Sequence, residues 1–506
     1  MVGMLLARVD RGAPAVAAPG RATLDYGGLA GLVERVASGL ASAGIGPGDA
    51  VALVAPNGPE ALAATLAVAD AAAVAPLNPA LAEAEFRFLL RDLRARALLL
   101  AGEASGGAAR AAREAGIPLL EIRPDPTGAA GRFDLECAAG QPAAPAFERR
   151  DPSIALLLHT SGTTARPKLV ALRREALALS ARAIARGLAL TPRDRCLNVM
   201  PLFHVHGLVG AALSSIAAGA AVCCTPGFDP LRFRRWLIEC GATWYSAVPS
   251  MHQAIAARLR GGDGSPRPPG PALRLARSCS SPLPARVRAA LSACLEVPVV
   301  NAYGMTEAAH QVASTKADDA GKAGGVCPVG LSSGPAVGVL DESGRWLPPG
   351  SPGEILLRGE TVITAYEQPD EANLRSFHDG WLRTGDEGVV AAGGEITLTG
   401  RIKELINAAG EKVSPYEVED ALLSHPSVAE AVCFAVPDRS RGESVGAAVV
   451  LAAGACADER ALRRFVAERL APCKVPERVL TLGALPKGPT GKLQRVGLAA
   501  ALGLGS

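Results

Sequence analysis

The stretch from Leu156 to Lys168, LLLHTSGTTARPK, constrains the fold of this chain more than any other segment. Its first part is a short apolar run that predicts a buried parallel strand, and it leads directly into a hydroxyl- and glycine-rich loop that ends in a lysine. Glycine lets backbone amides turn toward an anion, hydroxyl groups add donors, and lysine supplies a point charge. The loop therefore predicts a nucleotide-phosphate site formed by Thr160, Ser161, Gly162, Thr163, Thr164 and Lys168.

A solvated surface loop is the ordinary alternative, because clusters of Ser, Thr and Gly are common in loops. The position of the loop favours a binding site. It follows the apolar run Ile154–Leu158, and a helical pattern over Arg174–Leu190 begins a few residues later. Proteins of the α/β class bind ligands at such strand-to-helix junctions. No lysine has the G-x-x-x-x-G-K-[ST] context, which excludes a P-loop NTPase.

Charge and size restrict the classes of partner. The chain of 506 residues carries 52 basic and 49 acidic residues, a formal net charge of +3, with both signs interspersed. A nucleic-acid or membrane-surface protein would concentrate its basic residues, so small-molecule partners are favoured. The length and the 49% apolar composition allow more than one domain with a buried core.

Cysteine usage predicts a reducing compartment, and the cytoplasm is the expected location. The 11 cysteines form no C-x-x-C pair and no Cys/His ligand cluster, so we expect no zinc site. Cys223 and Cys224 are interpreted as small core residues. The N-terminal apolar run is too short for a signal peptide. The uncharged stretch Gly207–Thr225 resembles a membrane span, but its Gly and Ser content favours a buried helix that leads into a strand.

The order of apolar patterns predicts a multi-domain α/β protein. Between Leu29 and Leu120, helical patterns alternate with short strand-like runs, as in a doubly wound sheet, and the alternation resumes at Ser153. The segment Pro124–Pro152 is expected to be a surface connection. Residues 325–400 show short strands with frequent Gly and Pro, which predicts a β-rich subdomain. We predict a large N-terminal domain, residues 1–400, and a small α+β C-terminal domain, residues 401–506.

Five sequence blocks, taken together and in this order, resemble the adenylate-forming superfamily of acyl-CoA synthetases, luciferases and peptide-synthetase adenylation domains. They are the loop Thr160–Lys168, NAYGMTE (Asn301–Glu307), GWLRTGDEG (Gly380–Gly388), GRIKELINAAGEKVSPYEVE (Gly400–Glu419) and PKGPTGKLQR (Pro486–Arg495). The resemblance implies an enzyme that activates a carboxylic acid with ATP and Mg²⁺ and transfers it to CoA. It also implies that the C-terminal domain is mobile.

The block NAYGMTE contains three candidate site residues. A carboxylate can attack the α-phosphate of ATP only if the phosphate charge is neutralised, so Glu307 is the expected Mg²⁺ ligand and Thr306 an expected phosphate contact. Tyr303 offers a flat face for adenine in a chain with only 4% aromatic residues. The alternative for Tyr303 is a half-buried core aromatic.

The resemblance assigns nucleotide, hinge and catalytic roles in the later blocks. Asp386 is expected to accept hydrogen bonds from the ribose hydroxyls, Arg401 to contact the ribose as well, and Lys403 to be the hinge. Lys492 is expected to be the main catalytic residue, in contact with the ATP phosphates and the acid. The Gly410 region would line the pantetheine tunnel after the domain rotates. The alternatives are a turn-forming aspartate, a solvated charge run and a flexible Gly-Lys turn.

Within this superfamily the chain resembles the oxalate-CoA ligases. The resemblance rests on four segments that hold four of the seven histidines, namely PLFHVHGL (Pro201–Leu208), ATWYSAVPSMHQ (Ala242–Gln253), RSCSSPL (Arg277–Leu283) and EAAHQVAS (Glu307–Ser314). A small dianion needs hydrogen-bond donors where a fatty acid would need apolar residues. The resemblance implies that Ser280 and His310 hold the distal carboxylate of oxalate, with His206 as a further candidate. A satisfied core histidine is the alternative for His310.

Other functions remain open at this point. Ligases for malonate and for short-chain, medium-chain or aromatic acids share much of the same framework. An adenylation domain that feeds a carrier protein is disfavoured, because the chain ends shortly after Arg495 with no carrier-like module. A non-catalytic nucleotide-binding protein of the same fold is disfavoured because Lys168, Glu307, Asp386 and Lys492 are all present.

Overall fold

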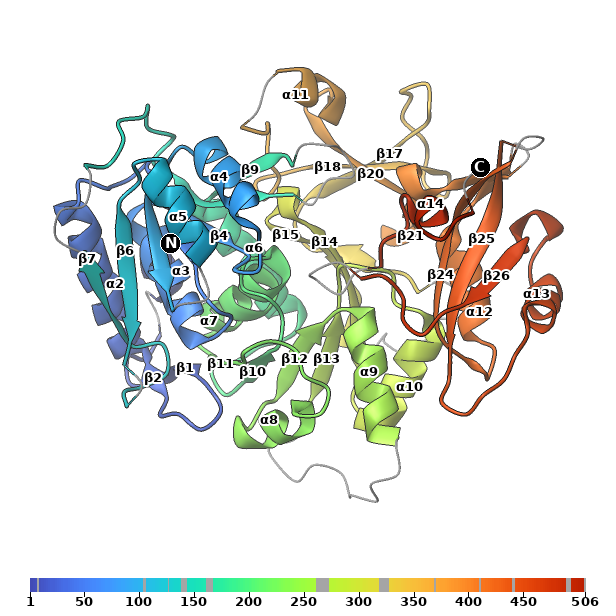
Figure 1. Ribbon diagram of the computed structural model, residues 1–506, viewed down its shortest axis with the longest axis horizontal. Coiled ribbons are helices and arrows are strands. Elements are labelled where there is room, and N and C mark those ends of the chain that lie inside the picture. The colour runs from blue at the N-terminus through green and yellow to red at the C-terminus, as the bar shows by residue number, and fades with distance from the viewer. Residues whose placement is uncertain are drawn as a thin grey trace.

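The computed structural model describes residues 1–6, 9–102, 106–125, 127–137, 143–160, 167–260, 273–317, 327–367, 370–408, 411–438, 442–487 and 493–504. Among these residues, the strands form three sheets of 14, seven and five strands. Figure 1 shows the N-terminal sheet in blue at one end of the molecule and the C-terminal sheet in orange and red at the other. The arrangement confirms a multi-domain α/β protein.

The seven-stranded sheet is doubly wound, as expected for the alternating patterns between Leu29 and Leu120. Its order is β7-β6-β5-β3-β4-β8-β9, with parallel neighbours from β6 to β8 and antiparallel strands β7 and β9 at the edges. Its elements are α2 (Tyr26–Ser42), β3 (Ala50–Val54), α3 (Pro59–Ala71), β4 (Ala73–Leu77), α4 (Glu83–Asp92), β5 (Ala95–Ala101), α5 (Gly106–Glu114), β6 (Leu119–Pro124), β7 (Phe133–Cys137), β8 (Ile154–His159) and β9 (Leu169–Arg173).

One expectation within this sheet is wrong. The segment Pro124–Pro152 is not only a surface connection, because β7 lies inside it and pairs with β6. The Pro and Gly content of the whole segment conceals this short edge strand, which follows a turn at residues 127–131.

The 14-stranded sheet joins a parallel part to the β-rich part. Its order is β17-β18-β20-β21-β16-β15-β14-β13-β12-β10-β11-β1-β2, with β19 beside β20. Neighbours from β14 to β1 are parallel, whereas β15 pairs antiparallel with β14 and begins the β-rich part. The β-rich region is thus a continuation of the parallel part of the 14-stranded sheet, and the two parts meet at the strand pair β14–β15.

The strands of this sheet and the helices connected to them have the following bounds. The strands are β1 (Pro14–Ala17), β2 (Leu24–Asp25), β10 (Arg195–Asn198), β11 (Ala221–Cys224), β12 (Trp244–Ala247), β13 (Leu275–Ser278), β14 (Val299–Met305), β15 (His310–Ser314), β16 (Gly330–Ser332), β17 (Ala336–Leu340), β18 (Pro352–Arg358), β19 (Phe377–His378), β20 (Trp381–Val390) and β21 (Glu395–Arg401). The helices are α1 (Val2–Leu6), α6 (Arg174–Gly187), η2 (His206–Leu213), α7 (Ser214–Ala217), α8 (Phe233–Glu239), α9 (Pro249–Arg260), α10 (Ala285–Leu295), η3 (Thr306–Ala308) and α11 (Asp370–Ser376).

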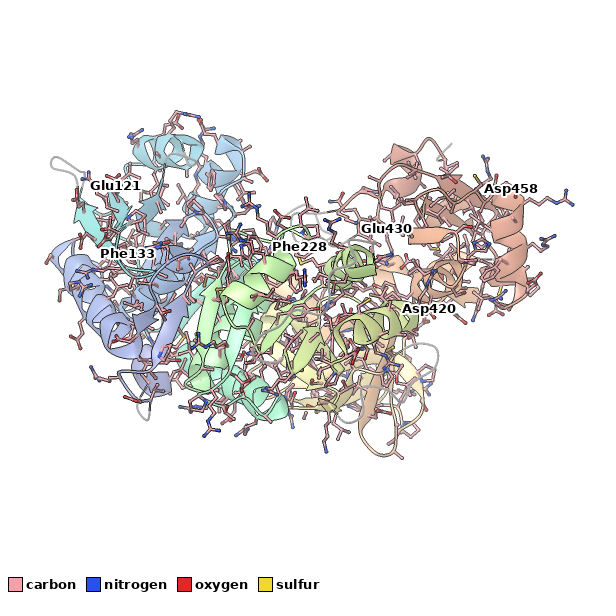
Figure 2. All side chains as sticks on the ribbon, turned by 90° about the horizontal axis from the view of Figure 1, so that it is seen from below. Glu121, Phe133, Phe228, Asp420, Glu430 and Asp458 are labelled. Carbon is pink, nitrogen blue, oxygen red and sulfur yellow. A yellow bond between two sulfur atoms is a disulfide. The ribbon has the colours of Figure 1, made fainter. Side chains whose placement is uncertain are left out.

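The C-terminal part contains the five-stranded sheet. Strand β22 begins it at Ile406, after β21 has ended the larger sheet at Arg401. Its elements are η5 (Ile402–Glu404), β22 (Ile406–Ala408), β23 (Glu411–Val413), α12 (Pro415–Leu423), β24 (Val428–Asp438), β25 (Gly442–Leu451), α13 (Glu459–Ala467), η6 (Pro472–Lys474), β26 (Arg478–Thr481) and α14 (Leu498–Ala501). Figure 2 shows Asp420 and Glu430 on the side that faces the rest of the chain, and Asp458 on the far side.

The uncharged stretch Gly207–Thr225 is a buried helical segment that leads into a strand, as expected. Helices η2 and α7 are buried along nearly their whole length, and β11 follows them. No helix in the described part of the chain has the length and apolar character that crossing a membrane requires.

Cys223 is a buried core residue, as expected, but it is not a free thiol. Cys223 on β11 forms a disulfide with Cys240, which follows α8. Both residues belong to the same buried apolar cluster, where the packing of α8 on the sheet brings them together. Cys224 is a free, buried cysteine, as expected.

Candidate active site

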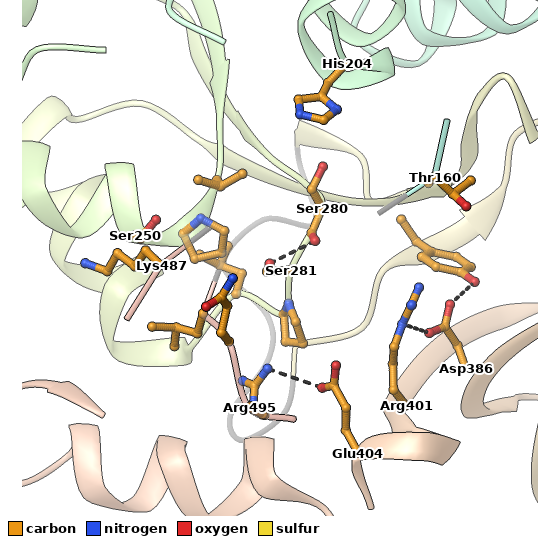
Figure 3. Close-up of a pocket in the computed structure, with 18 of the residues that line it drawn as sticks. Thr160, His204, Ser250, Ser280, Ser281, Asp386, Arg401, Glu404, Lys487 and Arg495 are labelled. Atoms are coloured by element: carbon orange, nitrogen blue, oxygen red, sulfur yellow. Dashed lines mark hydrogen bonds and ion pairs between the residues drawn. The ribbon is translucent and has the colours of Figure 1, made fainter. Parts of the chain in front are cut away.

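A cavity of about 1200 Å³ opens between the sheets of the N-terminal part and the C-terminal part of the chain. Figure 3 shows residues from distant segments on its walls, among them Thr160, Ser280, Asp386, Arg401 and Arg495. Thr160 and Ser280 follow strands β8 and β13 at the carboxyl ends of parallel strands, which is where α/β proteins bind their ligands.

The predicted phosphate loop begins at this cavity. The backbone N–H of Thr160 donates to the carbonyl of Lys168 at 2.9 Å, which fixes the two ends of the loop against each other. Thr160 lines the cavity. The predicted contacts Ser161, Gly162, Thr163 and Thr164 lie outside the described residues, and their roles stay predictions.

Lys168 is half-buried, and groups from the β-rich region hold its ammonium. Nζ donates to Oγ of Ser376 at 2.8 Å and lies 4.4 Å from the centroid of the Tyr366 ring. Burial lowers the pKa of Lys168 from its ordinary value; Glu307 opposes this shift and Lys403 adds to it. The predicted phosphate cation, metal ligand and hinge residue therefore lie close enough to influence one another.

Glu307 is buried on η3, directly after the half-buried Thr306. Its Oε1 accepts a hydrogen bond of 2.8 Å from the hydroxyl of Tyr366. Burial, reinforced by Glu307, raises the pKa of Tyr366, so this hydroxyl stays a donor at neutral pH. The described residues contain no cluster of three or more potential metal-ligating side chains. A Mg²⁺ ion held by one carboxylate, substrate phosphates and water fits Glu307 under these conditions.

Three predicted nucleotide residues from separate blocks meet on the cavity wall. The hydroxyl of Tyr303 donates to Oδ2 of Asp386 at 2.5 Å, and Nε of Arg401 donates to Oδ1 at 2.8 Å. Tyr303 is 8% exposed and Asp386 is 5% exposed, so both are held rigidly. Burial and the neighbouring Asp386 raise the pKa of Tyr303, which keeps its proton on the phenol.

The predicted hinge residue Lys403 is exposed on η5, between the last strand of the larger sheet and the first strand of the C-terminal sheet. Gly410 and Lys492, the predicted tunnel and catalytic residues, lie outside the described residues. Their roles stay predictions.

The C-terminal wall of the cavity contains a buried ionic cluster. Arg495 Nη1 lies 3.3 Å from Oε2 of Glu404, and Nη2 lies 2.7 Å from Oε2 of Glu419. The guanidinium also lies 4.5 Å from the centre of the Tyr416 ring. Arg495 thus fixes η5, which contains Lys403, against helix α12.

The three predicted acid-binding residues, Ser280, His206 and His310, lie together at another end of the cavity, which we call the acid end. Ser280 lines the cavity, and its Oγ lies 3.0 Å from Nδ1 of His206. The rings of His206 and His310 are stacked, with centroids 5.4 Å apart. Both histidines are buried, at 3% and 1% exposure, and lie behind Ser280 and not on the lining itself. Direct contact of His206 or His310 with the acid stays a prediction.

Backbone conformation also marks this acid end. Ser280 has a φ of 76° and His310 a φ of 87°. Residues other than glycine rarely adopt such angles, which cost on the order of 1–3 kcal/mol and cluster at functional sites.

Two residues near the site were missed by sequence reasoning. Tyr366 orients Glu307 and packs on Lys168, and Arg277 lies fully buried beside His310. Of the two, only Tyr366 had a signal in the sequence. Tyr303, Tyr366 and Tyr416 are three of only five tyrosines, whereas Arg277 lies in the segment LRLARSCS, where arginine and serine are interspersed with apolar residues.

The chain matches two families of known proteins over most of its length. The family described as AMP-binding enzyme matches residues 6–367, and the AMP-binding enzyme C-terminal domain matches residues 417–492. A probable CoA ligase of Humulus lupulus is 41% identical over 489 residues, covering 95% of this chain and 92% of that protein. The oxalate–CoA ligase of Arabidopsis thaliana is 40% identical over 490 residues, with coverage of 95% and 94%. The sulfoacetate–CoA ligase of Cupriavidus necator is 34% identical, with coverage of 94% and 92%.

The chain is also similar to solved structures over nearly its whole length. ATP-bound MatB from Rhodopseudomonas palustris has a TM-score of 0.86 and 29% identity, and the comparison covers 99% of this chain and 98% of that one. Apo MatB from the same organism has a TM-score of 0.77 at the same identity and coverage. The arrangement of this chain is therefore closer to the ATP-bound relative than to the apo relative.

Proposed function

Since this chain belongs to the AMP-binding enzyme family and is an AMP-forming acyl-CoA synthetase, we propose that its acid substrate is oxalate. The proposal rests on the polar acid end of the cavity, where Ser280 bonds to a buried, stacked histidine pair. A fatty acid tail cannot accept hydrogen bonds from this end of the cavity, whereas a small dianion can. The similarity to two oxalate–CoA ligases, at 40% and 37% identity, supports the same substrate.

The proposed reaction has two steps. An oxygen of one oxalate carboxylate attacks the α-phosphorus of ATP, the bond to the β-phosphate oxygen breaks, and pyrophosphate leaves. The sulfur of deprotonated CoA then attacks the carbonyl carbon of oxalyl-AMP, and the carbon–oxygen bond to AMP breaks. The products are oxalyl-CoA, AMP and pyrophosphate.

The residues of the cavity would divide these tasks. Asp386, oriented by Tyr303 and Arg401, would accept hydrogen bonds from the ribose hydroxyls. Glu307 would hold Mg²⁺, which supplies charge neutralisation on the phosphates, and Lys168 would add a cation on the same side.

The C-terminal part would complete the site. We propose that residues 1–400 and 401–506 are two domains that rotate about Lys403. In one orientation Lys492 would stabilise the charge that develops during adenylation, and in the other the Gly410 region would line the path of the pantetheine arm.

The test is pyrophosphate release with ATP, Mg²⁺ and CoA across oxalate, malonate, acetate, octanoate and coumarate. A clear preference for oxalate supports the proposal, and preference for an apolar acid keeps the ligase mechanism but overturns the substrate. The similarity to a sulfoacetate–CoA ligase makes another small dianion the second candidate. ATP binding without acid-dependent pyrophosphate release would instead support a non-catalytic nucleotide-binding protein.

Two variants separate mechanism from specificity. Lys492→Ala should abolish acid-dependent pyrophosphate release, and full activity in this variant would contradict its catalytic role. His310→Ala should lose the use of oxalate selectively while ATP binding is retained. Unchanged oxalate kinetics would remove the basis for placing the acid beside His310.

A further inference from the structure

Arg277 is a cation in the interior of the protein. It lies on β13, the strand between β12 and β14 in the larger sheet, and its exposed fraction is 0%. Central strands of such sheets are normally apolar on both faces. A charged side chain at this position therefore requires a specific explanation.

The groups around Arg277 leave its charge uncompensated. Nη1 donates to Oγ of Ser246 at 3.2 Å, and Nη2 donates to Oε1 of Gln311 at 2.9 Å and to Nε2 of His310 at 3.2 Å. Nε has no hydrogen-bond partner. No carboxylate in the described part of the chain forms an ion pair with the guanidinium. Burial lowers the pKa of Arg277 from its ordinary value, but a guanidinium keeps its proton in proteins.

One branch of hydrogen bonds leads from Arg277 to the cavity. Because Arg277 donates to Ser246, the hydroxyl of Ser246 has one hydrogen to give, and Nε2 of His206 at 2.7 Å is closer than the carbonyl of Arg277 at 3.4 Å. His206 then donates from Nδ1 to Ser280 at 3.0 Å. In this order, the hydroxyl hydrogen of Ser280 is directed to an acceptor in the cavity.

The second branch fixes the tautomer of His310. A guanidinium can only donate, so Nε2 of His310 is the acceptor, and the hydrogen of the neutral ring is on Nδ1. This ring lies against Gly304, a residue of the cavity wall, where an added Cβ would come 3.3 Å from Nδ1. The first branch therefore directs a donor hydrogen toward the acid end, and the second fixes the His310 ring behind it.

We propose that Arg277 is the positioning residue that makes the acid end of the cavity selective for dianionic acids, through the branches Ser246–His206–Ser280 and His310. The inference rests on the proposed function, since it supposes that the acid occupies this end. A second carboxylate there would compensate the buried charge and accept the hydrogen of Ser280. A monoanion of the same shape would lack the negative charge that the guanidinium requires.

The test compares oxalate with oxamate, which replaces one carboxylate by an amide of nearly the same shape. In the wild type, the apparent affinity for oxalate should exceed that for oxamate by about tenfold or more, as expected for one charge-assisted hydrogen-bonded contact. Arg277→Met should raise KM for oxalate about thirtyfold, with kcat changed less than threefold and KM for ATP unchanged, and should leave the inhibition constant of oxamate nearly unaltered. Arg277→Lys should restore part of the preference.

Arg274→Met is the matched control. Arg274 immediately precedes β13, but it is paired with Asp194 at 2.7 Å, so its loss should lower stability without changing the preference for oxalate over oxamate. An unchanged preference in Arg277→Met would overturn the inference. If Arg277→Met does not fold, the test uses the affinities of the wild type and of Arg277→Lys. Equal binding of oxalate and oxamate by the wild type would then overturn the inference.

The wild-type assay separates this inference from the proposed function. If the enzyme uses malonate and ignores oxalate, the proposed substrate is wrong, and the Arg277 test proceeds with malonate and its monoamide. Preference of the wild type for a monoanionic acid would overturn both.

Discussion

The phenolic oxygen of Tyr303 lies 2.5 Å from Oδ2 of Asp386, and this contact joins strand β14 to strand β20 at the cavity wall. Arg401 on β21 contacts the other oxygen of the same carboxylate at 2.8 Å. Each carboxylate oxygen has two acceptor positions, so both remain able to accept a ribose hydroxyl. In the proposed nucleotide site, the carboxylate would thereby be oriented before ATP binds, which would reduce the entropy lost on binding.

Tyr303→Phe should weaken ATP binding without removing the aromatic face. The loss of one hydrogen bond to a charged group corresponds to about 1.5 kcal/mol, so KM for ATP should rise about tenfold, with KM for the acid unchanged. Tyr26→Phe is the control, because the Tyr26 hydroxyl donates to the carbonyl of Ala220, away from the nucleotide residues. An unchanged KM for ATP in Tyr303→Phe would contradict the role given to Asp386.

Tyr366→Phe should alter the dependence on Mg²⁺. The variant removes the donor that orients Glu307 at 2.8 Å but keeps the ring beneath Lys168. Loss of a group that orients a metal ligand typically weakens the metal about tenfold, so the Mg²⁺ concentration for half-maximal pyrophosphate release should rise by this factor. Activity at saturating Mg²⁺ should change little. If the wild type and the variant needed the same Mg²⁺ concentration for half-maximal pyrophosphate release, Glu307 would not be a ligand positioned by Tyr366.

His252 should make the protein less stable at acidic pH. It is fully buried on α9 between Tyr245 and the carbonyl of Arg277, and burial lowers its pKa from 6.5 to about 4. At a pH between these two pKa values, His252 binds a proton in the unfolded chain but not in the folded chain. The stabilisation is therefore complete above about pH 6.5 and is lost progressively as pH falls toward 4, by at most about 3 kcal/mol.

Urea unfolding at pH 7.5 and pH 5.0 checks this expectation. His252→Gln should be less stable than the wild type at pH 7.5, and the difference should shrink by about 2 kcal/mol at pH 5.0. A constant difference between wild type and His252→Gln would refute the assigned shift.

The proposed nucleotide side of the site follows directly from sequence blocks, whereas the proposed acid side depends on tertiary contacts. Tyr303, Asp386 and Arg401 come from three separate blocks, and the structure brings them within hydrogen-bond distance. Each block contains its own turn and strand signals, so its position in the fold is encoded locally.

Arg277 shows why the rest was not predictable from local patterns. Its environment consists of Ser246 on β12 and of His310 and Gln311 on β15, which only the order of strands in the sheet brings together. The disulfide between Cys223 and Cys240 is similar, because a separation of 17 residues inside apolar patterns carries no pairing signal.

Helices α10 and α12 form a reciprocal contact between the N-terminal and C-terminal parts. The carboxylate of Asp420 on α12 accepts from the backbone N–H of Ala285 at the start of α10. In return, Arg286 Nη1 donates to the carbonyl of Leu423, the last residue of α12, and to two carbonyls that follow the helix, those of His425 at 2.8 Å and Val428 at 3.4 Å. An anion at a helix start and a cation at a helix end are both favourable with respect to the helix dipole.

Arg286→Ala should slow adenylation more than thioester formation. The contact exists in an arrangement whose TM-score is 0.86 with an ATP-bound relative and 0.77 with its apo form, so it should stabilise the orientation in which ATP reacts. Arg286 is exposed, which limits its contribution to about 1 kcal/mol and the expected loss in the rate of pyrophosphate release to about fivefold. Thioester formation from preformed acyl-adenylate should keep its rate.

Arg235→Ala, which removes an arginine paired only within its own helix, should change neither step. Equal slowing of both half-reactions by Arg286→Ala would show that the contact supports folding and does not select an orientation.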